Sequence, residues 1–191
     1  MTQTNSATID ALARVAEHGK AELIDGVVVE ISPTGFLPNY VAGEIYSSLR
    51  EYARRTRSGY AIGDNAGFVV HLPHRQSFSP DAAFYTGLPT GMRFLEGAPV
   101  FAVEVRSEND YGKQAERELA EKRADYFATG TLVIWDVDVL SDDIVRVYRA
   151  DAPEIPTIYR RGDSAEAEPA VPGWSLAVDD LFPYYPTSTQ Q

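Results

Sequence analysis

The segment from Phe101 to Asp138 constrains the fold most, because its residues read as strand, helix and strand in succession. An apolar run, FAVEVR, carries Glu104 in its middle, a charged helix follows, and Gly130 leads into a second apolar run that contains Trp135. Burying a carboxylate that has no partner costs roughly several kcal/mol. We therefore expect something to compensate Glu104, and the cost invites a functional explanation.

Length and composition favour a single domain. We expect one domain over residues 1–191, with a core from about 6 to 183 and a polar tail over 184–191. No apolar run approaches the roughly 20 residues that span a bilayer, and the N-terminal residues lack the basic and apolar regions of a signal peptide. We therefore expect a cytoplasmic protein without a membrane partner. The absence of cysteine excludes disulfides, thiolate zinc sites and a cysteine nucleophile.

The charge of the chain bears on its partners. A formal net charge of −11 makes the field of the whole molecule repel phosphate backbones, which counts against tight, non-specific binding to nucleic acid. A local basic surface is still compatible with this charge, because the segment 50–57 holds four arginines. These arginines form either such a surface or the solvated end of a helix, where they would complement the helix dipole.

Hydrophobic periodicity and turn residues give a coarse order of elements. Helices are predicted over about 8–18, 39–56 and 113–128, and a hairpin over 22–31. Two or three short strands are predicted between 60 and 85, and further strands at 101–106, 131–138, 144–148 and 157–159. The acidic, alanine-rich stretch 161–173 is predicted to be a surface loop, after which residues 174–182 return to the body of the protein.

Two carboxylates in predicted strands are candidate metal ligands. Asp81 opens a strand directly after Pro80, and Glu104 lies within a later strand, so adjacent strands could hold both acids at one end of a sheet. Paired hard oxygen ligands suit Mg²⁺ or Mn²⁺, which bind substrate phosphate and keep several waters. A nearby lysine, such as Lys122 in the helix, could orient the attacking water and stabilise the developing negative charge.

Spacing alone leaves a purely structural interpretation open. In that interpretation Asp81 caps a turn, Glu104 pairs with Arg106 on the same strand face, and Lys122 is one of many solvated helix charges. No G-x-S-x-G elbow, Walker loop, G-x-G-x-x-G or H-E-x-x-H pattern is present in the sequence. Hydrolase triads, phosphate-binding loops and zinc-protease sites therefore have no local support.

Five blocks of sequence between residues 22 and 138 occur in an order that is more specific than any one of them. They are E-L-I-D-G at 22–26 with Ser32-Pro33, S-P-D-A-A at 79–83, Pro99 with Glu104-Val105 and Ser107, Lys122 with Tyr126 and Gly130, and Trp135 with Val137-Asp138. Together they resemble the Uma-two family of endonucleases, which is assigned to the PD-(D/E)XK nuclease superfamily. The resemblance implies an α/β (α+β) restriction-endonuclease-like fold, with a central mixed β-sheet flanked by helices and additional antiparallel strands.

The resemblance also implies roles for individual residues. Asp81 and Glu104 would be the metal-binding acids, with Mg²⁺ or Mn²⁺ as the cofactor. The superfamily's lysine, two residues after the glutamate, is replaced here by Arg106, which cannot act as a base because its pKa stays above about 12. Lys122, from the following helix, is therefore predicted to be the catalytic lysine, and Glu22 and Arg106 are supporting residues.

The activity that the resemblance implies is metal-dependent endonucleolytic hydrolysis of phosphodiester bonds, with nucleic acid, DNA above all, as the partner. Many nucleases that cut both strands act as dimers, so a homodimer stays open. The chain departs from its relatives at 38–40, where they often carry a histidine, and directly after Ser107. These departures keep a second hypothesis open, in which an inactive member of the same fold binds nucleic acid or a protein.

Overall fold

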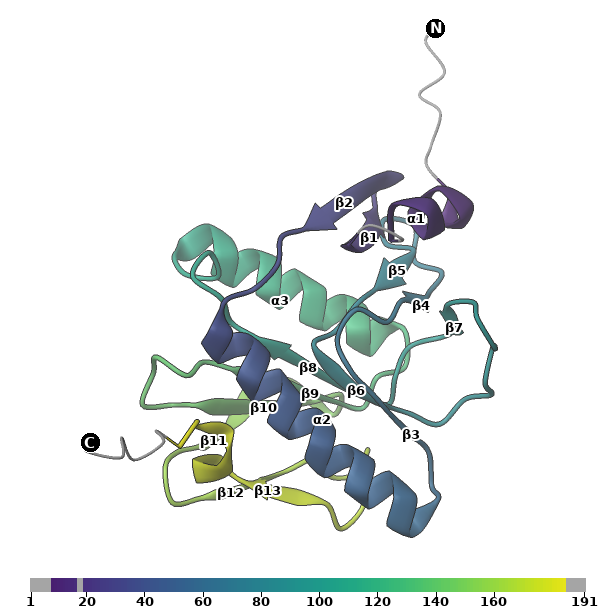
Figure 1. Cartoon of the computed structure of the whole chain (residues 1–191). Helices are drawn as coiled ribbons and strands as arrows, with labels where there is room; N and C mark the ends of the chain where they lie inside the picture. Colours follow the sequence, from purple (N-terminus) through teal and green to yellow (C-terminus); the bar gives the residue numbers. More distant parts are fainter. Residues whose placement is uncertain (1–7, 17–18, 185–191) are drawn as a thin grey trace, which may run out of the picture.

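The computed structural model describes residues 8–16 and 19–184, which form the helices and strands drawn in Figure 1. In chain order the elements are α1 (Ile9–Ala16), β1 (Lys20–Ile24), β2 (Val27–Ile31), α2 (Phe36–Thr56), β3 (Tyr60–Ile62), β4 (Phe68–Val69), β5 (Ser77–Phe78), β6 (Ala82–Tyr85), β7 (Leu95–Glu96), β8 (Phe101–Val105), α3 (Lys113–Ala128), β9 (Val133–Val137), β10 (Val145–Arg149), β11 (Ala152–Tyr159), β12 (Ser164–Glu166), β13 (Ser175–Ala177) and the 3₁₀-helix η1 (Val178–Leu181).

The centre of the fold is a six-stranded mixed sheet with the order β11-β10-β9-β8-β6-β3. Strands β8 and β9 are parallel, and the other neighbouring pairs in this sheet are antiparallel. Because a parallel pair needs a crossover connection, α3 joins β8 to β9. Smaller sheets, β1-β2, β12-β13 and β5-β4-β7, lie around this centre. The predicted mixed sheet with flanking helices and additional antiparallel strands is confirmed.

Helices α2 and α3 cover opposite faces of the central sheet (Figure 1). Phe101, Val103 and Val105 of β8 belong to the cluster on the α2 face, and Ala102 belongs to the cluster on the α3 face. Successive residues of β8 therefore face opposite sides of the sheet. Glu104, two residues after Ala102, points to the α3 side, where the helix can supply polar partners.

The second helix begins earlier than its sequence suggests. Helix α2 starts at Phe36, three residues before the predicted start at 39, although Pro38 lies in between. Proline is tolerated there because the first turn of a helix needs no backbone donor. The predicted helix end at 17–18 and the tail from 185 onwards lie outside the described residues. No helix in the described part of the chain is long and apolar enough to cross a membrane.

The prediction of a surface loop over 161–173 is wrong. The segment contains β12, and Ala165, Ala167 and Val171 are buried against the cluster on the α2 face. The burial of these alanines was not predicted, because small apolar residues alternate here with glutamates and the composition is that of a polar loop. The segment is followed by Trp174, whose ring lies 5.1 Å from that of Trp135, as expected for a return to the body of the protein.

Candidate active site

Asp81 lies beside Glu104 because its backbone and its side chain bind the residues on either side of that glutamate. The Asp81 amide donates to the carbonyl of Val103 at 3.0 Å, and the amide of Val105 donates to Asp81 Oδ2 at 2.8 Å. Both acids therefore sit at the same end of the adjacent strands β6 and β8. The structure brings the two predicted metal-binding acids together.

Helix α3 presents two side chains to Glu104. Lys122 Nζ lies 2.9 Å from Glu104 Oε2, and the hydroxyl of Tyr126 donates to Glu104 Oε1 at 2.7 Å. The two residues are four positions apart and therefore share one face of the helix. Tyr126 is fully buried and stacks on Phe78 with ring centroids 3.9 Å apart, which fixes the hydroxyl in place. Both oxygens of Glu104 are thereby oriented.

Glu22, the predicted supporting acid, also reaches Lys122. Its Oε1 atom lies 3.0 Å from Lys122 Nζ and accepts a 3.0 Å bond from the amide of Ser79. Its Oε2 atom accepts a 2.7 Å bond from Arg75 Nη1. Glu22 is 3% exposed, so these donors compensate a carboxylate that water cannot reach. The ammonium of Lys122 is thus held between Glu22 and Glu104.

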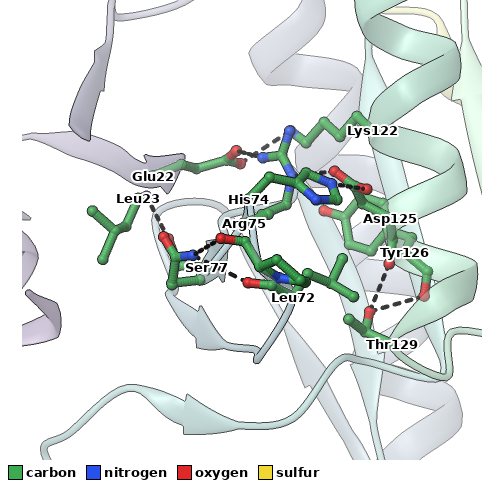
Figure 2. Close-up of polar contacts among 12 residues, drawn as sticks. Glu22, Leu23, Leu72, His74, Arg75, Ser77, Lys122, Asp125, Tyr126 and Thr129 are labelled. Carbon is green, nitrogen blue, oxygen red and sulfur yellow. Dashed lines mark hydrogen bonds and ion pairs between the residues drawn. The ribbon is translucent and has the colours of Figure 1, made fainter. Parts of the chain in front are cut away.

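Arg75 connects the site to the rest of α3. Figure 2 shows its guanidinium between Glu22 of β1 and Asp125 of the helix. Arg75 Nε donates to Asp125 Oδ2 at 2.7 Å, and the other Asp125 oxygen lies 2.7 Å from His74 Nε2. Arg75 is therefore a cross-link between the strand that carries Glu22 and the helix that carries Lys122.

A second lysine binds the other acid. Lys20 Nζ, at the start of β1, lies 2.6 Å from Asp81 Oδ1 and 2.8 Å from Oδ1 of Asp64, which follows β3. Because residues i and i+2 of a strand share a face, Lys20 and Glu22 reach the same side of the hairpin. One strand therefore contributes both a cation and an anion to the site.

The pKa values of the two glutamates are shifted in opposite directions. Burial raises the pKa of Glu104, and the nearby carboxylates of Asp81 and Glu22 raise it further against the opposing effect of Lys122. Burial would also raise the pKa of Glu22, but the cations of Lys122 and Arg75 hold it below its ordinary value. Of the two glutamates, Glu104 is thus the one whose negative charge is less well compensated by the protein.

Lys122 stays positively charged. Burial alone would lower its pKa, but the carboxylates of Glu104 and Glu22 raise it above the ordinary value. An ammonium with a raised pKa holds its proton at neutral pH. Its chemical contribution is therefore positive charge, directed at the space beside Glu104.

Arg106 faces a different set of acids. Its Nε and Nη2 atoms each donate to Asp136 of β9 at 2.7 Å, and the guanidinium also binds Glu116 in the first turn of α3. The hydrogen bonds with Asp136 strongly raise the pKa of Arg106. Among the described residues, the cation bound to Glu104 is Lys122, so the expected alternative of a Glu104–Arg106 pair is not the arrangement observed.

Sequence reasoning missed Lys20, Asp64, Arg75 and Asp125. Three of them come from short strands or turns far along the chain from Glu104, and no spacing rule connects them to it. Asp125 could have been noticed, because it lies one turn from Lys122 on the same helix. Lys20 also carries a weak signal, since it stands two residues before the predicted supporting acid Glu22.

Comparisons with known proteins agree with the architecture. The Uma2 (Uma-two) family, described as "Putative restriction endonuclease", matches residues 8–179. A solved structure described as that of "a putative nuclease belonging to DUF820" from Anabaena variabilis ATCC 29413 shares the fold, with a TM-score of 0.68 and 16% sequence identity over 90% of this chain and 96% of that one. None of the curated proteins compared has a significant match to this sequence. Because the family match extends over most of its length, the chain belongs to the Uma2 family.

Proposed function

We propose that this protein is a metal-dependent endonuclease that hydrolyses phosphodiester bonds, with DNA as its substrate. The observation that carries the proposal is the arrangement of Asp81 and Glu104 on adjacent strands, with the ammonium of Lys122 2.9 Å from Glu104. Membership of the Uma2 family, which is described as "Putative restriction endonuclease", supports the same activity. A cytoplasmic location and a homodimer stay predictions.

The residues present fit Mg²⁺ or Mn²⁺. The described residues contain no group of three His, Cys, Asp or Glu side chains arranged as a complete metal cage. Asp81 and Glu104 instead offer two carboxylates, which matches Mg²⁺, since this ion is usually held by one or two carboxylates together with waters and substrate phosphate. The raised pKa of Glu104 supports the assignment, because a cation would relieve the repulsion from its acidic neighbours.

The chain's own residues orient the acids and supply charge. Tyr126 and Lys122 fix the two oxygens of Glu104, and the amide of Val105 fixes one oxygen of Asp81. The positively charged Lys122 would stabilise the negative charge that develops on a phosphate beside Glu104. A divalent cation bound to these acids would polarise the scissile phosphate and lower the pKa of a bound water.

Cleavage assays with Asp81→Asn test the proposed function. We expect the wild type to cut DNA only when Mg²⁺ or Mn²⁺ is added, and Asp81→Asn to lose about 10²–10³-fold of that activity, as when one charge-stabilising group is removed from an active site. The control is Asp151→Asn, at an exposed acid that follows β10. Equal activity in Asp81→Asn and the control would refute the mechanism, and a parallel RNA substrate decides between the nucleic acids.

Lys122→Met separates catalysis from metal binding. The substitution removes the ammonium but keeps most of the unbranched side chain, so we expect kcat to fall by about 10²–10³-fold. Mn²⁺ affinity should be kept or increased, because a positive charge beside Glu104 is lost. Single-turnover cleavage and Mn²⁺ titration measure the two effects, with Lys113→Met at the exposed start of α3 as the matched control. A parallel loss of both properties would contradict this role.

A further inference from the structure

Lys20 occupies the oxygen of Asp81 that a metal ion would need. Lys20 Nζ lies 2.6 Å from Asp81 Oδ1, and the other oxygen, Oδ2, accepts the hydrogen bond from the amide of Val105. That amide belongs to the last residue of β8 and cannot move without disturbing the sheet. Lys20 reaches Asp81 through a flexible four-carbon side chain, so its ammonium is the donor that can leave.

The same ammonium has a second partner to which it can move. Asp64 Oδ1 lies 2.8 Å from Lys20 Nζ, and the Asp64 side chain is 37% exposed, whereas that of Asp81 is 20% exposed. Asp64 thus lies on the solvent side of the ammonium and Asp81 on the protein side. If the bond with Asp81 breaks, the charge of Lys20 is still paired.

We propose that Lys20 is a displaceable counter-ion of the metal site, and that Asp64 holds its ammonium when a divalent cation binds Asp81. The inference rests on the proposed function, since it concerns the affinity of that metal site. Two cations on one carboxylate oxygen repel each other, so the metal ion must compete with Lys20 for Asp81 Oδ1. Lys20 therefore sets the divalent-ion concentration at which the site fills.

Lys20 and Lys122 differ in this respect. Lys122 lies between two acids that both belong to the site, Glu104 and Glu22. Moving it would take a cation away from Glu22, a carboxylate that water hardly reaches. Lys20 lies between one acid of the site and one partly exposed acid outside it. The first arrangement holds its cation in place, and the second lets its cation shift outwards.

Mn²⁺ titration of the full-length protein, followed by electron paramagnetic resonance, tests the proposal without DNA. We expect Lys20→Met and Lys20→Gln to bind Mn²⁺ about tenfold or more tightly than the wild type, because the competing charge is gone. The glutamine variant can still donate a hydrogen bond to Asp81 and protects the test against misfolding of the methionine variant. Lys113→Met, which removes the same charge far from the acids, should leave the affinity unchanged.

A double-mutant cycle with Asp64→Asn tests the second half of the proposal. Asp64→Asn should weaken Mn²⁺ binding in the wild type, because the negative charge that we assign to the displaced ammonium of Lys20 is then lost, and should have no effect in the Lys20→Gln background. Equal effects in both backgrounds would mean that Asp64 acts only through its charge, and would overturn its assigned role. Unchanged affinity in both Lys20 variants would overturn the role of Lys20 while leaving the metal site intact. Absence of Mn²⁺ binding in every variant would overturn the proposed function together with the inference.

Discussion

Replacing Glu104 by glutamine is expected to lower cleavage by about 10²–10³-fold while leaving the fold intact. The substitution removes the carboxylate that we assign to the metal, but the amide oxygen can still accept the hydrogen bond from Tyr126. Lys122 also keeps an anionic partner, because Glu22 Oε1 lies 3.0 Å from its Nζ atom. The loss should therefore appear in kcat and in Mn²⁺ affinity, and not in circular dichroism.

The same variant should be at least as stable as the wild type at neutral pH when EDTA is present. The pKa of Glu104 is higher in the folded protein than the ordinary value of 4.5, so the folded state binds more protons than the unfolded state between these two values. Stability contributed by this group is consequently lost as the pH rises through that window, and ionised Glu104 destabilises the fold above it. Glutamine does not titrate, so the advantage of the variant should shrink as the pH falls towards 4.5.

Urea unfolding at several pH values measures this difference, and Glu121→Gln is the control. Glu121 lies on α3 next to Lys122 in sequence, but its side chain is exposed. If Glu104→Gln were strongly destabilised at neutral pH, the carboxylate would be serving the structure rather than the site. Full activity in Glu104→Gln would in turn remove it from the proposed metal ligands.

Replacing Arg106 by methionine is expected to cost about 3–5 kcal/mol of unfolding free energy, the usual result of removing one partner from a buried ion pair. Asp136, the acid that would be left, is 2% exposed. The nearest remaining cation in the described part of the chain is Arg123, whose Nη1 atom lies 3.8 Å from Asp136 Oδ2. The first turn of α3 would also lose the ion pair between Glu116 and Arg106.

Denaturant unfolding tests whether Arg106 is structural. Arg117→Met, at an exposed arginine of α3 whose hydrogen bond goes to the backbone of Lys113, should change stability little. The double variant Arg106→Met/Asp136→Leu should recover most of the lost stability, since no buried charge is left unpaired. If Arg106→Met kept wild-type stability but lost cleavage, Arg106 would belong to the chemistry, as the family resemblance suggested.

Local patterns predicted the parts of the fold that local physics determines. The bounds of α3 match the predicted 113–128. The two faces of β8 follow from the two-residue period of side-chain direction in a strand. The start of α2 and the course of 161–173 were not predictable in this way. The first depends on tolerance of Pro38 in a first turn, and the second on packing of alanines into the buried cluster on the α2 face, which composition does not reveal.

The residues of the candidate site also fall into those that the sequence could predict and those that it could not. Asp81, Glu104 and Lys122 could be predicted because ordered motifs contain them, and the structure brings all three together. The partners of Lys20 and Arg75 could not be predicted, because they depend on how separate strands and turns meet in space. For Arg106 a local pattern was misleading. The two-residue period places it near Glu104, but β8 ends at Val105, and the side chain binds Asp136.

The hairpin β1–β2 contributes to the candidate site from outside the central sheet. Its strands form a sheet of their own, with a small apolar cluster around Leu12 and Leu23, outside the six-stranded sheet that carries the two acids. Lys20 and Glu22 both come from this hairpin. In the proposed site, sequence changes at Lys20 of the hairpin would therefore alter the affinity for a metal ion while β6 and β8, next to Asp81 and Glu104, keep their register.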